Sequence, residues 1–76
     1  MTSKFEHEFV DTVQGLRTEG RSVKVLFRLQ AAEYTLEADS PHFEEAVVAL
    51  IQGWEAQSPV QLVVVGTKVQ AARPGD

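Results

Sequence analysis

The segment from Ser40 to Trp54 constrains the fold most, because its spacing is that of an amphipathic helix. Ser40 is a suitable N-cap, and Pro41 follows at a position where its missing N–H is not needed. Large apolar residues recur at i, i+4, i+7, i+8 and i+11, which places them on one stripe. These residues are Phe43, Val47, Leu50, Ile51 and Trp54. We expect the stripe to face the core, with Trp54 at its end.

A second segment can be laid on this one without a gap. Residues 5–16 match residues 43–54, with identical Phe, Glu, Val, Gln and Gly positions. Such self-similarity favours a repeated unit. It predicts a helix over residues 4–18, with Ser3 as its cap and Glu6 at the capping-box position.

The same stretch also fits a strand, because Val10, Thr12 and Val13 are β-branched. The order of elements would then be β-β-β-α-β-β. That order is typical of an OB-like small β-barrel with one helix, which is the alternative fold.

Two hairpins are predicted on either side of the helix. Residues 22–29 and 33–38 alternate between apolar and polar side chains, and a tight turn at Ala31–Ala32 would pair Leu29 with Tyr34.

In the final hairpin, Gly66–Thr67 suits a type II′ turn that pairs Val64 with Val69.

The preferred fold is α+β: a four-stranded, mainly antiparallel sheet with two helices on one face, in αββαββ order. It forms one small domain over residues 1–76, with possible αββ repeats at 3–39 and 40–72 and a flexible tail at 73–76. The helix-free face should be polar, yet it would carry apolar side chains. We take that face as a protein interface, with candidate residues Leu26, Val63, Val65, Lys24 and Arg28.

Composition supports association as the source of stability and function. A chain of 76 residues without cysteine has a small core and no disulfides to reinforce it. Its net charge of −4 gives no footprint for nucleic acid or an anionic membrane. The N-terminal residues Met1–Glu8 lack the apolar stretch of a signal peptide, and no apolar run is long enough to cross a membrane. A cytoplasmic location is therefore expected.

Side chains with catalytic or metal-binding potential are sparse. His7 and His42 lack metal-ligand spacing, and the Glu44–Glu45 pair suits the positive end of the helix dipole. We expect no catalytic residue, no metal and no cofactor, and therefore no enzyme.

Three functional interpretations follow from the residues. The preferred one is a non-catalytic domain acting through protein–protein association, with itself as the simplest partner. The alternative is a nucleic-acid-binding module that uses the basic hairpin Arg17–Arg28. The third is an enzyme or ligand-binding protein whose site forms between protomers around His7 or His42.

Overall fold

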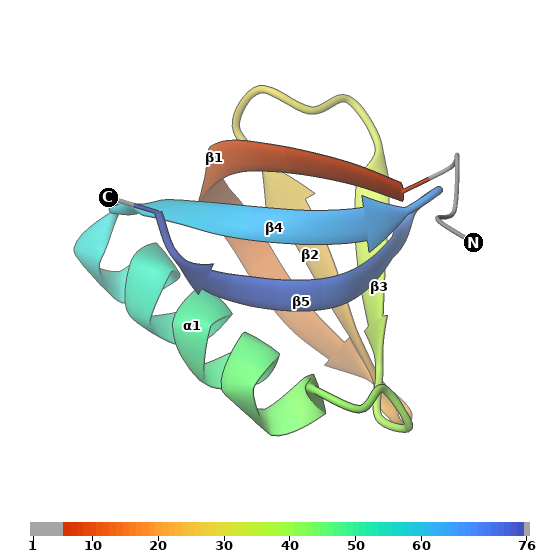
Figure 1. Cartoon of the computed structure of the whole chain (residues 1–76). Helices are drawn as coiled ribbons and strands as arrows, with labels where there is room; N and C mark the ends of the chain where they lie inside the picture. The colour runs from red at the N-terminus through yellow and green to blue at the C-terminus, as the bar shows by residue number, and fades with distance from the viewer. Residues whose placement is uncertain (1–5, 76) are drawn as a thin grey trace.

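Five strands and one helix make up the fold of this chain (Figure 1). The computed structural model describes residues 6–75. In chain order the elements are β1 (Glu6–Glu19), β2 (Ser22–Phe27), β3 (Glu33–Glu37), α1 (Phe43–Ala56), β4 (Pro59–Val65) and β5 (Lys68–Pro74).

The strands close into a barrel in the order β1-β2-β3-β5-β4. All neighbours are antiparallel except β3 and β5, which are parallel and share the single pair Thr35–Lys68. β1 belongs to two ladders, because its first half pairs with β4 and its second half with β2. A bulge between Val13 and Gly15 lies between the two halves, where β1 curves around the barrel (Figure 1).

The two-helix sheet and the αββ repeat are wrong, because residues 6–19 form a strand. The helical pattern placed Phe9 and Val13 four residues apart, and an even spacing also puts side chains on one face of a strand. The extra residue in the bulge then returns Leu16 to the inner face, opposite Val25. The resulting order, β-β-β-α-β-β, is the one that the strand interpretation implied. Ser3 and Phe5 lie outside the described residues.

The barrel interior is filled by apolar side chains from every strand. Three aromatic rings meet in it, with centroids 5.5 Å apart for Phe9–Phe27, 5.6 Å for Phe9–Tyr34 and 5.5 Å for Phe27–Tyr34. The largest side chains with almost no exposed surface are Phe27, Leu36, Leu50, Leu62, Val13, Val25, Val60, Val64 and Val69.

Helix α1 lies across the lower end of the barrel in Figure 1. It lies where the spacing predicts a helix, but its buried face is rotated toward the small residues Ala46, Ala49 and Gly53, with Leu50. Small side chains let the helix backbone approach the barrel closely: a Cβ added at Gly53 would collide with the Val60 side chain.

That rotation leaves two members of the predicted stripe outside the core. Ile51 is 40% exposed and Trp54 is 39% exposed, so the expectation that Trp54 is a core residue is wrong. The helix begins at Phe43, after His42 as N-cap, and Ser40 makes no cap with its side chain. Instead, the Ser40 carbonyl accepts a hydrogen bond from the Phe43 N–H, at 3.1 Å.

The β2–β3 hairpin has a longer loop than predicted. Val25 pairs with Tyr34, and the loop carries Leu29 out to 77% exposure. The cause is a remote carboxylate: the Leu29 N–H donates to Asp11 Oδ2 at 3.0 Å, which fixes the loop to β1. Asp11 is buried, and its other oxygen accepts the Thr12 N–H at 2.7 Å.

The β4–β5 hairpin is as predicted. Val64 pairs with Val69, and Gly66 has the positive φ of 61° that a type II′ turn requires at this position. Arg73 and Pro74, expected in a flexible tail, are the last residues of β5.

Candidate functional site

The apolar interface candidates occupy two separate places on the barrel. Leu26 of β2 pairs with Gly15 in the second half of β1, whereas Val63 of β4 pairs with Glu8 in the first half of β1. Glu8 and Gly15 are seven positions apart on β1, which is about 23 Å measured along the strand at the usual rise. Val65 lies further from Leu26 still, opposite Glu6. The structure therefore brings Val63 and Val65 together and leaves Leu26 apart.

The basic candidates lie on the β2 side. Lys24 Nζ donates a hydrogen bond to Thr35 Oγ1 at 3.0 Å, and Arg28 is exposed just after the end of β2. Nearby, Arg17 forms ion pairs with Glu33 at 3.4 Å and with Glu19 at 3.5 Å. These contacts make the surface a mixture of both charges.

The rings that would stack on nucleic-acid bases are not on that surface. Phe27 is 2% exposed and Tyr34 is 8% exposed, and both pack in the barrel core. Stacking on bases requires an accessible ring face. The basic hairpin therefore does not offer Phe27 or Tyr34 for stacking on the bases of a single-stranded nucleic acid.

We define the outer β4 face as the outward side chains of three adjacent strands. Their register places them in three rows across β1, β4 and β5. The rows are Glu6–Val65–Lys68, Glu8–Val63–Ala71 and Val10–Gln61–Arg73.

Charge on the outer β4 face is divided by strand. Both acidic residues, Glu6 and Glu8, lie on β1, whereas Lys68 and Arg73 lie on β5. Between them runs β4 with Val63 and Val65, which are half-buried by their neighbours. The face thus has an apolar centre line, one negative flank and one positive flank.

One polar group interrupts the centre line. Gln61 Nε2 donates to Glu8 Oε1 at 3.4 Å, and Arg73 Nε donates to Gln61 Oε1 at 3.1 Å. This chain of hydrogen bonds joins the two flanks at one end of the face. In the row of Glu6, Val65 and Lys68, the negative and the positive side chain stand on opposite flanks with the apolar Val65 between them.

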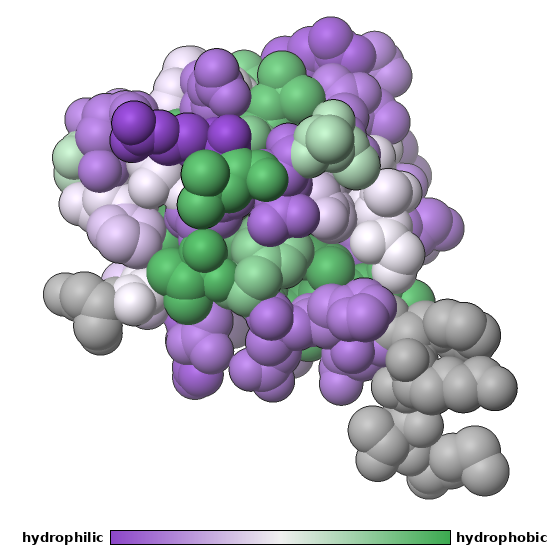
Figure 2. Space-filling model, turned by 90° about the horizontal axis from the view of Figure 1, so that it is seen from above, coloured by the Kyte–Doolittle hydropathy of each residue, from purple (hydrophilic) through white to green (hydrophobic). Residues whose placement is uncertain are grey.

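Apolar exposure continues from this face onto the top of the barrel. In Figure 2, hydrophobic side chains gather in the middle of the upper surface, over β1 and the loop that follows β2, and hydrophilic ones surround them. On these elements Val10 is 50% exposed and Leu29 is 77% exposed. Exposed apolar side chains gathered among polar ones are typical of a surface that contacts another molecule rather than water alone.

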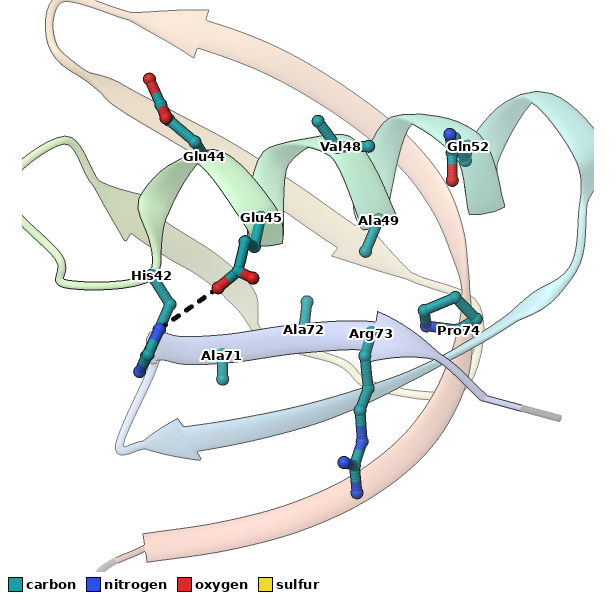
Figure 3. Close-up of a pocket in the computed structure, with 10 residues that line it drawn as sticks. All are labelled: His42, Glu44, Glu45, Val48, Ala49, Gln52, Ala71, Ala72, Arg73 and Pro74. Carbon is teal, nitrogen blue, oxygen red and sulfur yellow. Dashed lines mark ion pairs between the residues drawn. The ribbon is translucent and has the colours of Figure 1, made fainter.

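A groove of about 590 Å³ lies between α1 and β5 (Figure 3). Ala49 and Ala72 line its floor, and at one end His42 Nδ1 lies 3.4 Å from Glu45 Oε1. The Arg73 side chain points away from α1. Because the His42 and Glu45 side chains are 60% and 83% exposed, their pairing is weak. The groove presents no nucleophile held by a base.

A smaller crevice of about 200 Å³ lies on the other flank of α1. Leu16, Val23 and Val47 line it, and Trp54 and Ile51 complete its apolar walls. Sequence reasoning missed this crevice because it placed Trp54 in the core. The signal was present in Ala46, Ala49 and Gly53, whose helical spacing marks a close-packed face.

Among residues 6–75, no three His, Asp or Glu side chains are grouped so that they could hold a metal ion. The part of the chain that the structure describes contains no helix with the length and hydropathy needed to cross a membrane. Comparison with known proteins finds no matching family model, no matching characterised protein and no matching solved structure.

Proposed function

We propose that this domain acts by protein association, itself included as a partner, and carries out no catalysis. The observation that supports the proposal is the outer β4 face. Its apolar line along β4 lies between an acidic strand and a basic strand, so apolar and electrostatic complementarity coincide on one surface. Interfaces combine a water-excluding centre with a polar rim in the same way.

The size of the face sets the expected strength. Three strands over three rows offer a surface well below the roughly 1,200 Å² of total burial found in stable complexes. Complexes of that size are weak and transient. We therefore expect association at high protein concentration, with rapid exchange between free and bound forms.

Sedimentation velocity from about 10 µM to about 1 mM tests the proposal in the range where small interfaces act. The wild type should sediment faster as concentration rises. Val63→Lys places a charge on the apolar line and should abolish that rise. Leu26→Lys is the matched control, because Leu26 is 44% exposed on a strand away from this face.

A wild type that stays monomeric throughout the range contradicts the proposal. The assignment to this face also fails if Leu26→Lys and Val63→Lys weaken association equally. Circular dichroism of each variant should match the wild type, which separates a lost interface from a lost fold.

A further inference from the structure

We infer that the partner of the outer β4 face is the same face of a second copy, docked about a two-fold axis that runs along β4. This inference rests on the proposed function and adds the partner and its orientation. Each Glu6 then faces Lys68 of the other copy.

The argument begins with the order of charges across the three strands. The row Glu6–Val65–Lys68 is negative on β1, apolar on β4 and positive on β5. A rotation of 180° about β4 exchanges the positions of β1 and β5 and leaves each row at its own height. The negative end of the row in one copy therefore meets the positive end in the other, and this happens twice.

The same rotation matches the apolar residues. Val63 meets Val63 of the second copy, and Val65 meets Val65, so that a continuous apolar line forms between the two barrels. A barrel surface is convex, so two barrels docked face to face touch over a small central area. The axis along β4 places that area on the apolar residues Val63 and Val65.

The other face-to-face arrangement is disfavoured by charge. A two-fold axis running across the strands would set β1 on β1 and β5 on β5. With its centre at the middle row, Glu8 would face Glu8, and Lys68 would approach Arg73. Like charges in contact weaken an interface and select against that arrangement.

Symmetric docking of this kind is closed, because each surface is used once. The partner is therefore one further copy rather than a growing chain. The ion pairs lie at the rim, where salt screens them, so dimerisation should weaken as ionic strength rises.

Charge reversal tests the orientation directly. Glu6→Lys creates two Lys–Lys contacts in the dimer, and Lys68→Glu creates two Glu–Glu contacts. Each single variant should dimerise about tenfold or more weakly than the wild type, because two attractive pairs become repulsive.

An equal mixture of the two variants should restore association. In the mixed dimer, the two substituted positions face each other with opposite charges, and the native Lys68 of one copy faces the native Glu6 of the other. Both pairs are then attractive again. The double variant, with both changes in one chain, should also dimerise like the wild type. Sedimentation velocity of the two single variants, their mixture and the double variant measures all four states.

Matched controls account for net charge. Glu55→Lys changes the charge by the same amount as Glu6→Lys, but on exposed α1, and Arg21→Glu matches Lys68→Glu at the β1–β2 turn. Both controls should dimerise like the wild type.

The outcomes separate the two proposals. If the wild type dimerises and the single reversals also dimerise normally, or if their mixture fails to recover, the orientation is wrong while the proposed function stands. If the wild type never dimerises, both are overturned.

Discussion

β1 and α1 begin from nearly the same twelve-residue pattern and become a strand and a helix. In β1 every second side chain enters the barrel, as Phe9, Asp11 and Val13 do. In α1 the buried residues follow a helical period instead. The shared pattern fixes only which large apolar residues lie on one side. It does not fix whether the side chains repeat with the period of a helix or of a strand, because a spacing of four residues puts side chains on one side of either element.

The positions between the large apolar residues account for the difference. Where α1 has Ala46 and Ala49, β1 has Glu8 and Asp11. Alanine favours a helix and leaves room for close packing, whereas Asp disfavours a helix interior. Asp11 is buried in β1 because its carboxylate accepts two backbone N–H groups, from Thr12 and Leu29.

The largest difference in the free energy of unfolding is expected between substitutions at the matched positions Leu50 and Thr12. Leu50 has no exposed surface, whereas Thr12 is half-buried on the outer side of β1. Leu50→Ala should lower the free energy of unfolding by about 2–5 kcal/mol, because a cavity remains in the core. Thr12→Ala should cost less than about 1 kcal/mol. Urea denaturation measures both, and equal losses would show that the two segments bury the same positions.

A medium effect is expected at the matched glycines Gly53 and Gly15. Alanine at a helical glycine normally stabilises by about 1 kcal/mol. Gly53→Ala should instead destabilise by about 1–3 kcal/mol, because the new methyl group collides with Val60. Gly15→Ala should change stability by less than about 0.5 kcal/mol, since the nearest atom, Leu26 Cδ1, is 3.9 Å from the added Cβ.

Chemical denaturation of both glycine variants tests this reversal. A second measurement uses a Val60→Ala background, in which the penalty of Gly53→Ala should shrink if the collision causes it. A stabilising Gly53→Ala would mean that α1 lies further from β4 than described.

The smallest contrast concerns how each segment ends. β1 is followed by Gly20 at φ 62°, whereas α1 is followed by Gln57 at φ 54°. A left-handed backbone costs a non-glycine residue about 1–2 kcal/mol. Gln57→Gly should therefore stabilise by up to about 1 kcal/mol, reduced by the lost hydrogen bond from Gln57 Nε2 to the Trp54 carbonyl. Gly20→Gln should destabilise by about 1 kcal/mol.

Thermal denaturation measures these shifts, and 1 kcal/mol corresponds to about 4–8 °C in a domain of this size. Shifts of the same sign in both variants would contradict the assigned backbone conformations.

Local signals in the sequence were sufficient for part of the fold. The helix after Ser40, the alternation in β2 and β3, and the turn at Gly66 each depend on residues close in sequence, and the structure has all three. For β1 the residues leave a helix and a strand open, because even spacing is ambiguous between them, and the preferred helix is wrong. The β2–β3 register was missed because Asp11, far away in sequence, fixes Leu29.

The candidate site was predictable to a similar degree. Alternation along β4 is enough to place Val63 and Val65 on one side. A flat sheet would place Leu26 beside them, whereas β1 curves and divides its length between two partner strands. The opposition of Glu6 and Lys68 does not follow from the sequence pattern, because a helix over residues 4–18 makes Glu6 part of a capping box.

The single pair that joins β3 to β5 makes this seam the barrel's weakest join. Beside the pair Thr35–Lys68, the Thr35 N–H donates a hydrogen bond to the Thr67 carbonyl at 2.8 Å. Beyond Lys68, α1 lies beside β5 and covers its edge. If α1 moved away from β5, the barrel could open at this seam for a small cost in free energy. The edges of β3 and β5 would then be exposed, and their unpaired backbone groups promote domain swapping and aggregation.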